Sequence, residues 1–460
     1  MGEKYITESI AEIIEGTEYQ LLNKQEIEKT KYCILDSIGC TLGGAKTEIG
    51  SILIKTLANN ESSLKNTYTI IGSRERADKL NAIYINANNA NILDYDDVYL
   101  GHPNSTIVPV AFNLAEEIKV TGKELINAIC LAYNLMLKIG LGLRQKEERK
   151  YRLGHSTWQT FGSMIVASKF LDLDRKEIAN ALGITGCNAP IPSVMKSVYG
   201  DTGPTMVKNT YGIASVSGVI AAKLAKNGFT GPRDFFEGET GFWRMIGSNT
   251  NLVKGKIEKQ NDENLILRIG FKPYPCCRLT HSSIEAADNI MKETNLSYLD
   301  IKEINIKTVR ALTKSPFSNA TPTDFYSGKF SLPYVVACNL KGIEKVRWHD
   351  KENIESQEVT ELAKKVTIQW DNDADLQFQL DPGKITSTVE ILYKNGQKKF
   401  TKIEIPLGDP RNPMTPIQLK EKFLSLADRT KTSESRKLFD LIMDIENIKD
   451  MNNLISYLRY

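Results

Sequence analysis

Helical periodicity over the first 270 residues constrains the fold more than any other feature of the chain. Between residues 21 and 44, apolar side chains recur at the spacing of one helix face, at Ile27, Ile34, Leu35, Ile38 and Leu42. We expect the glycine pair at 43–44 to end this helix. Further helices are expected over residues 74–92, 109–120, 121–140 and 205–227. Their many small residues allow close helix packing, so the pattern predicts a large all-helical domain.

The character of the sequence changes near Phe271. Residues 301–309 alternate imperfectly between apolar and polar, and residues 387–406 predict a hairpin that turns at Asn395-Gly396. Another β-rich segment lies at 366–371, and helical patterns separate these strands. We therefore predict a helical first part over residues 1–270, a smaller α+β domain over 271–408, and C-terminal helices over 409–460 that return to the first part.

Composition excludes several classes of protein. A chain of 460 residues is long enough for two domains, and its net charge of +3 gives no basic footprint for nucleic acid. We find no uncharged apolar run approaching the roughly 20 residues that span a membrane, and the N-terminus reads as an amphipathic helix. Seven cysteines without paired CxxC spacing favour free thiols over disulfides or a zinc site. The chain is therefore expected to be soluble and cytoplasmic.

A polar stretch after the helix expected at 74–92 concentrates ionisable groups. Asp94, Asp96 and Asp97 fall within four residues, and His102 precedes a proline that disfavours helix. Residues 104–106 (Asn, Ser, Thr) offer N-caps for the next helix, whose free amides would face the same loop. This combination suits proton transfer on an anionic substrate. A capped, solvated loop is the alternative.

Three other stretches carry comparable groups. His155 lies in a hydroxyl-rich turn directly before a helical pattern, as His102 does, although each histidine alone is also compatible with a structural role. Lys208 is expected in the first turn of a helix, where the helix dipole disfavours a cation, so it either binds a ligand anion or is a solvated surface lysine. The stretch 271–281 supplies Lys272, Arg278 and His281.

The remaining histidine and the adjacent cysteines have plainer interpretations. His349 reads as a surface residue. Cys276 and Cys277 are neighbours in the chain and would pair only with strained geometry, so we expect buried thiols.

Five ordered blocks resemble the signature segments of the MmgE/PrpD family. They lie at residues 93–117, 154–185, 206–232, 271–287 and 330–340. The family includes 2-methylcitrate dehydratase, cis-aconitate decarboxylase and iminodisuccinate epimerase. The resemblance implies a mainly α protein in which a smaller α+β lid domain is inserted into a large all-helical domain. It also implies a homodimer that acts on a small di- or tricarboxylate without a metal or organic cofactor.

The resemblance also assigns site residues. It implies catalytic positions at Asp94, His102, His155, Lys208, Lys272 and Tyr334. Substrate-binding positions are expected at Lys208, Lys272, Arg278, His281 and Ser105. In this hypothesis His102 transfers the proton and is oriented by Asp94, His155 is a second acid/base or an oxyanion donor, and the lysines anchor carboxylates.

Two departures from the family pattern leave the reaction open. Val98 stands where many members have threonine, and Tyr211 stands where a histidine is common. The short loop between Asp97 and His102 resembles the decarboxylase-like or epimerase-like members more than the dehydratases. Three functions remain: a cofactor-free lyase that dehydrates or decarboxylates a polycarboxylate, an epimerase of an imino diacid such as iminodisuccinate, and a catalytically silent carboxylate-binding protein.

Overall fold

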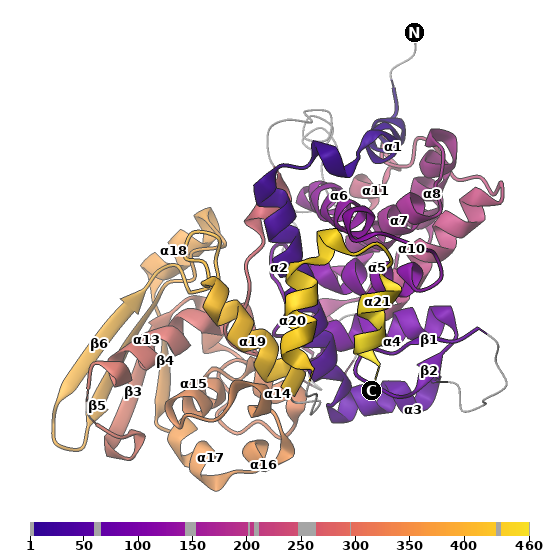
Figure 1. Cartoon of the computed structure of the whole chain (residues 1–460). Helices are drawn as coiled ribbons and strands as arrows, with labels where there is room; N and C mark the ends of the chain where they lie inside the picture. Colours follow the sequence, from indigo (N-terminus) through magenta and orange to yellow (C-terminus); the bar gives the residue numbers. More distant parts are fainter. Residues whose placement is uncertain are drawn as a thin grey trace.

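The first part of the chain is helical, as predicted (Figure 1). The computed structural model describes residues 4–58, 66–142, 153–200, 203–206, 211–246, 264–294, 296–428 and 434–459. Up to residue 246, the helices are α1 (Ile6–Gly16), α2 (Lys24–Ala45), α3 (Glu48–Leu57), α4 (Lys79–Ile92), α5 (Val108–Ala115), α6 (Gly122–Leu141), α7 (Ser156–Phe170), α8 (Arg175–Cys187), α9 (Val194–Ser197), α10 (Tyr211–Lys226) and α11 (Phe242–Met245).

Side-chain caps set several of these boundaries. A capping box opens α6: the Thr121 side chain accepts from the Glu124 amide, and Glu124 reaches back to the Thr121 amide. The glycine pair 43–44, by contrast, does not end α2, which continues to Ala45. A Cβ atom on Gly44 would lie 2.1 Å from the Asn89 carbonyl oxygen of α4. This glycine therefore permits the close crossing of α2 and α4.

Helix α4 begins later than the sequence pattern indicated. Helix α4 starts at Lys79 behind the cap residue Asp78, because the preceding strand β2 (Arg76–Ala77) pairs with β1 (Tyr68–Thr69). Helix α10 is described from Tyr211 onward, and residues 207–210 of the predicted helix lie outside the described part of the chain.

The segment after Phe271 contains the predicted strands, in one four-stranded sheet of order β4-β3-β5-β6. Strand β3 pairs in parallel with β4 and antiparallel with β5, and β5 and β6 form the predicted hairpin around Asn395-Gly396. The strands are β3 (Ile301–Thr308), β4 (Val366–Trp370), β5 (Ser387–Tyr393) and β6 (Lys398–Ile403). The helices are α13 (His281–Lys292), α14 (Phe325–Phe330), α15 (Leu332–Leu340), α16 (Lys351–Ile354), α17 (Gln357–Ala363) and α18 (Asn372–Leu380).

The chain then becomes helical again, with α19 (Pro416–Asp428), α20 (Ser435–Met443) and α21 (Asn452–Ile455). Helices α19 and α20 lie against α2 (Figure 1). Their buried side chains, such as Phe423 and Leu438, belong to the same core cluster as those of α1 to α8. A second cluster gathers the side chains of the sheet and its helices. The boundaries at 270 and 408, and an insertion that acts as a lid, stay predictions.

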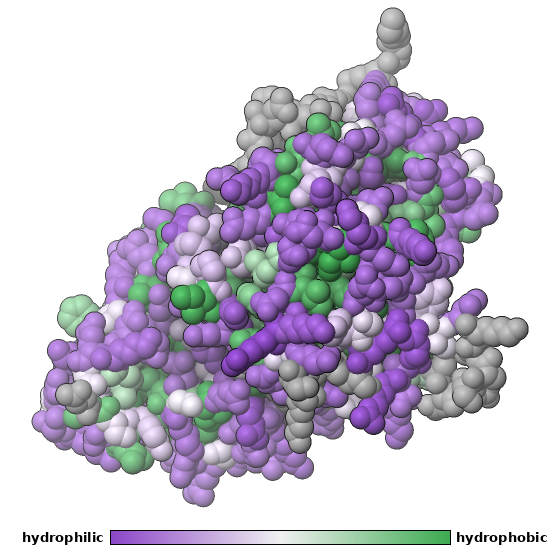
Figure 2. All heavy atoms as spheres, in the orientation of Figure 1, coloured by the Kyte–Doolittle hydropathy of each residue, from purple (hydrophilic) through white to green (hydrophobic). Residues whose placement is uncertain are grey.

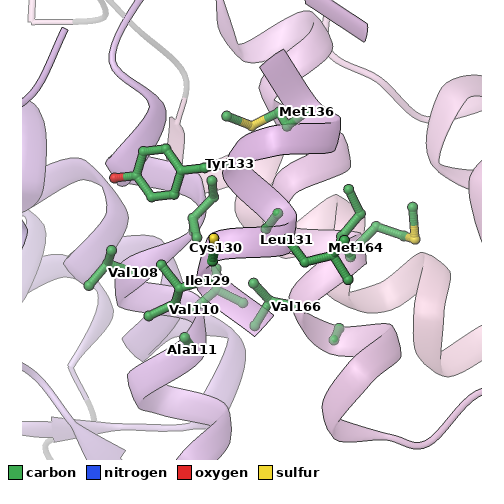
Figure 3. Close-up of a cluster of buried hydrophobic side chains, with 14 of the residues drawn as sticks. Val108, Val110, Ala111, Ile129, Cys130, Leu131, Tyr133, Met136, Met164 and Val166 are labelled. Atoms are coloured by element: carbon green, nitrogen blue, oxygen red, sulfur yellow. The ribbon is translucent and has the colours of Figure 1, made fainter. Parts of the chain in front are cut away.

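The helical core is tightly packed where α5, α6 and α7 meet. Figure 3 shows Val108 and Val110 of α5 beside Ile129 and Leu131 of α6, with Met164 of α7 close by. Helix α6 is the one described helix long and apolar enough to cross a membrane, but 78% of its apolar window is buried inside the protein, as in a core helix. Hydrophilic side chains cover most of the face shown in Figure 2.

Candidate active site

The loop that follows α4 brings the predicted acidic residues and His102 into the interior. Asp94 and Leu100 adopt positive φ angles of 51° and 57°, which non-glycine residues seldom do. Gly101 has a φ of 148°, and a Cβ atom there would lie 2.7 Å from the ring of His155. Val98 and Gly270 exchange backbone hydrogen bonds of 2.9 and 3.0 Å, which tie the loop to the segment that carries Lys272.

Two carboxylates flank the His102 imidazole. Nδ1 lies 3.1 Å from Asp96 Oδ1, and Nε2 lies 3.5 Å from Asp94 Oδ1. The residue is only 8% exposed, and burial lowers the pKa of His102 although Asp96 acts in the opposite direction. The neutral imidazole is therefore favoured near neutral pH, the form that accepts a proton. Asp96 is nearer to the ring than the predicted partner Asp94.

Lys272 neutralises Asp94. Its ammonium lies 2.5 Å from Asp94 Oδ1 and also donates to the Asp94 carbonyl at 2.9 Å, in a site where the lysine is 1% exposed. Burial opposes the charged amine, but Asp94 and Asp96 outweigh it and raise the pKa of Lys272. A buried pair of this kind is held by mutual attraction together with the extra hydrogen bond. Lys272 thus contacts Asp94 directly, a partner that the sequence did not indicate.

Amides and hydroxyls hold Asp96 behind the ring. Asn91 donates to both of its carboxylate oxygens at 2.9 and 3.1 Å, and Asn104 and Ser105 contact Oδ2 at 3.2 and 3.4 Å. Although burial favours the neutral acid, His102 lowers the pKa of Asp96. The expectation that residues 104–106 cap the next helix is wrong, because they form a short 3-10 helix, η2 (Pro103–Thr106), whose side chains bind the carboxylates instead.

Asp97 lies one step further from the ring. Its Oδ1 accepts from the backbone and side-chain amides of Asn104 at 3.2 and 2.7 Å, and its Oδ2 accepts from the Tyr133 hydroxyl at 2.7 Å. Burial and the Asp96 charge raise the pKa of Asp97 to about 7. Asn104 therefore bridges two carboxyl groups that ionise at different pH.

The second predicted histidine lies beside the first. The ring centroids of His102 and His155 are 6.2 Å apart, and Tyr211 lies at the same distance from His102 on another side. His155 is the residue before α7, as its sequence predicted. Tyr211 opens the described part of α10 and is fully buried. Lys208, predicted to approach this site, lies outside the described residues.

Arg278 and His281 bind the protein itself. The Arg278 guanidinium donates to the carbonyls of Leu407 at 2.8 Å and Pro406 at 3.2 Å, and its Nη1 lies 3.3 Å from His281 Nδ1. Because a guanidinium only donates, Nδ1 of His281 accepts, and Nε2 carries the proton towards the Cys276 carbonyl at 3.2 Å. Burial, Arg278 and Lys272 lower the pKa of His281 well below its ordinary value. His281 therefore stays neutral.

A pocket of about 500 Å³ lies on the other side of the loop, lined by Val98 and Leu100 among others. It contains Arg411, whose charge is met by Asp409 and Asp381. The lining includes neither His102 nor Lys272. The predicted substrate-binding residue Arg278 also lines this pocket. We place the chemistry at His102 because the predicted acids and both predicted histidines gather there.

Tyr334 and His349 lie in the second core. The Tyr334 hydroxyl donates to the Trp348 carbonyl, and no described contact brings it to His102 or Lys272. His349 is 4% exposed and donates from Nε2 to the Pro275 carbonyl at 2.6 Å, so its interpretation as a surface residue is wrong. The Pro275 carbonyl, three residues after Lys272 in the chain, could not be inferred as its partner from the sequence around His349.

Lys329 approaches the loop without having been predicted. It is fully buried, donates to the Ile92 carbonyl at the end of α4 at 2.6 Å, and lies 3.9 Å from the centre of the Tyr326 ring. Lys329 directly precedes the block at 330–340 and is not part of it. Its neighbours in the sequence, a glycine and a phenylalanine, did not indicate that the lysine would be buried.

Asp94, Asp96 and His102 each place one donor atom within 4.8 Å of the others, a spacing that suits a metal ion. The Lys272 ammonium already supplies positive charge to Asp94, and amides occupy the oxygens of Asp96. A buried imidazole between ionised carboxylates, beside a second imidazole, is instead suited to moving a proton.

Comparisons with known proteins agree with the sequence blocks. Human cis-aconitate decarboxylase is 25% identical over 99% of this chain and 95% of its own length. Cis-aconitate decarboxylase from Aspergillus terreus is 24% identical, covering 94% and 91%. The 2-methylcitrate dehydratase of Salmonella typhimurium is 22% identical, covering 94% and 92%. The MmgE/PrpD N-terminal domain matches residues 8–253 and the MmgE/PrpD C-terminal domain matches residues 274–446. Since these matches cover most of the chain, it belongs to the MmgE/PrpD family.

Proposed function

We propose that the protein is a cofactor-free lyase that dehydrates or decarboxylates a small polycarboxylate. Its named relatives are a dehydratase of 2-methylcitrate and decarboxylases of cis-aconitate. The observation that carries this proposal is the buried His102 imidazole between Asp96 and the Lys272-bound Asp94. Both reactions move a proton at a carbon beside a carboxylate, which needs one well-positioned acid/base group in a dry site.

In this mechanism His102 carries the proton. Dehydration requires a base that removes the proton beside the carboxylate, and decarboxylation requires an acid that protonates the carbon receiving the electron pair when carbon dioxide leaves. Asp96 orients the ring through Nδ1, which leaves Nε2 as the transferring atom. His155, 6.2 Å away, serves as the second acid/base or as a donor to developing negative charge.

Substrate anchoring needs more positive charge than the described centre provides. Lys272 is paired with Asp94, so it offsets that carboxylate before it can attract another. We therefore assign the main carboxylate anchor to Lys208, as the family resemblance implies, and give Lys272 the task of keeping Asp94 in place. Arg278 and His281 act on the protein backbone and, in this proposal, do not touch the substrate.

Epimerisation of an imino diacid is the second candidate. The pair of imidazoles favours it, because a substrate lying between His102 and His155 could lose a proton to one ring and regain it from the other. A silent binding protein is the third, since Val98 and Tyr211 replace residues common in the family.

Proton NMR in deuterium oxide separates the three. Purified protein is incubated separately with cis-aconitate, 2-methylcitrate, citrate and iminodisuccinate. The proposal expects new product signals from one of the first three, with loss of water or carbon dioxide. Deuterium entering iminodisuccinate without a change of skeleton would favour the epimerase. Thermal stabilisation by a carboxylate without any turnover would favour the silent protein.

His102→Gln tests the central residue of the mechanism. We expect turnover to fall by at least about 100-fold, because loss of a general acid/base typically costs that much. Circular dichroism and the shift in melting temperature with substrate check that fold and binding remain. Lys420→Met, which changes an exposed lysine of α19, is the control and should keep full activity. Turnover by His102→Gln at the wild-type rate would remove His102 from the mechanism.

We also propose that the protein is a cytoplasmic homodimer. Helix α10 exposes two isoleucines on one face, Ile213 and Ile220, which lie seven residues apart. They are 46% and 36% exposed. Such an apolar face fits a contact between two copies of the chain. Light scattering after size-exclusion chromatography should give twice the chain mass of 51.6 kDa. The double variant Ile213→Asp with Ile220→Asp should give the mass of a single chain.

A further inference from the structure

Lys422 is a charged residue on the buried face of α19. Its neighbours on that face are Leu419, Phe423 and Leu426, and Lys422 itself is only 5% exposed. Its ammonium lies 2.5 Å from Oδ1 of Asp36, a residue of α2 that is 4% exposed. The two residues are 386 positions apart in the chain. The last part of the chain thus places a cation inside the helical core.

The same ammonium reaches the active-site loop. It donates to the carbonyl of Tyr95 at 2.5 Å and lies 4.2 Å from the centre of the Tyr95 ring. Tyr95 stands between Asp94 and Asp96, the two residues that flank His102. Because a peptide unit is planar, fixing the Tyr95 carbonyl also fixes the amide of Asp96 and the direction in which that residue leaves the chain.

Tyr95 continues the connection to Lys272. Its hydroxyl donates to the Pro273 carbonyl at 3.2 Å, directly after Lys272 in the chain. Asp94, on the other side of Tyr95, has a φ of 51° and needs surrounding contacts to stay in that conformation. The Tyr95 backbone and ring are therefore held between α19 on one side and the 272–273 segment on the other.

Stability alone does not explain this lysine. Buried ion pairs contribute little net stability compared with apolar residues of similar size, and α19 is otherwise apolar on this face. An apolar residue at position 422 would fill the same space but could not donate to the Tyr95 carbonyl. The contact that only a donor can make is the one to the loop.

We infer that Lys422 is a positioning residue for the active centre: it holds the Tyr95 peptide so that Asp94 and Asp96 keep their places around His102. This inference deepens the proposed function and rests on it for the effect on turnover. It also has a consequence that needs no substrate, since the environment of His102 depends on the loop. His102 faces Asp94, Asp96, Lys272, Tyr211 and His155.

The test replaces the ion pair by an apolar pair. Lys422→Met combined with Asp36→Leu removes one charge of each sign, so the local net charge is unchanged while the donor to Tyr95 is lost. Lys422→Arg keeps charge and donor, and Lys420→Met is the matched control on the exposed side of α19. Because the chain has only four histidines, imidazole signals of a nitrogen-labelled protein can be followed individually during a pH titration.

We expect the His102 titration in the double variant to move up towards the ordinary value near 6.5, because a loosened loop admits water to the ring. Lys420→Met should leave the His102 titration unchanged. On a substrate that the wild type turns over, kcat should fall on the order of 10- to 100-fold with a smaller change in KM, as for a misplaced catalytic group. Lys422→Arg should recover most of both properties.

A double variant with the wild-type His102 titration and wild-type kcat would overturn the inference and leave Lys422 as half of a core ion pair. If that double variant does not fold, Lys422→Leu with Asp36→Asn, which also lacks a donor at position 422, is measured in the same way, and the same two outcomes apply. Absence of activity on every substrate in the wild type would refute the proposed function, whereas the His102 titration would still decide the role of Lys422.

Discussion

Asp97 links the ionisation of the site to the stability of the protein. Its pKa is raised from 3.8 to about 7 by burial and by Asp96. Above pH 3.8 the unfolded chain holds fewer protons at this residue than the folded chain does. The free energy of unfolding therefore falls as the pH rises from about 4 to about 7, and it is independent of this group above that range.

Asp97→Asn should remove this dependence. Asparagine keeps the acceptor for Asn104, and the Tyr133 hydroxyl can accept from the new amide instead of donating. Between pH 5 and pH 7 the wild type should lose about 2–3 kcal/mol relative to the variant, from two pH units at 1.36 kcal/mol each. Urea unfolding of both proteins at the two pH values measures the difference. Parallel pH curves for the two proteins would show that Asp97 titrates normally.

His102 gives a second prediction at this scale. Because burial lowers its pKa below 6.5, it stays neutral and basic in mildly acidic solution. If it removes a proton from the substrate, kcat/KM should hold its plateau down to pH values below 6.5 and fall only beneath the lowered pKa. A fall of kcat/KM as the pH rises through neutrality would show instead that the protonated ring is the active form.

The residue scale is also where prediction from sequence was least complete. His102, His155 and Asp94 could be chosen because ionisable groups gathered in short polar turns. The hypothesis from the family resemblance named Asp94 as the partner of His102, whereas Asp96 is the nearer carboxylate and Asp94 has a positive φ. Lys272 was found as a cation, but its pairing with Asp94 joins residues 178 positions apart.

At the scale of elements, the active-site loop follows α4, and α4 crosses α2 closely at Gly44. Gly44→Ala should destabilise the protein by about 1–3 kcal/mol, as overpacking does, because the new methyl group meets the Asn89 carbonyl of α4. Gly16→Ala is the control, since nothing lies within 4 Å of a Cβ there. That variant should be neutral or slightly stabilising, by less than about 1 kcal/mol. Chemical denaturation of both variants checks the contrast, and equal effects would refute it.

Elements were predictable where local signals set them. The hairpin at Asn395-Gly396 is encoded within a few residues and appears where expected. The end of α2 was misjudged because a glycine pair is also what a close helix contact requires. The start of α4 was misjudged because strand pairing with residues 68–69 removed its first turn.

At the scale of the whole molecule, the chain enters and leaves the sheet-containing segment at one place. The Phe271 amide donates to the Gly408 carbonyl at 2.9 Å. A variant in which a short glycine-serine linker joins Gly270 to Asp409 should therefore fold into a helical unit, although less stable because it loses contacts such as that of Lys329 with Ile92. Circular dichroism and a cooperative thermal transition test this expectation. An unfolded product would refute the domain boundaries predicted at 270 and 408.

The contact between Lys422 and Tyr95 also imposes an order on biosynthesis. The two residues are 327 positions apart, so a ribosome that adds 5 to 20 residues per second makes the loop roughly 15 to 65 s before the lysine that holds it. For most of that interval, from the synthesis of His155 onward, the nascent chain contains both site histidines and both flanking aspartates without the donor to Tyr95. Activity, on this view, begins only when the final helices have left the exit tunnel, and a prematurely terminated chain carries the catalytic residues but not their alignment.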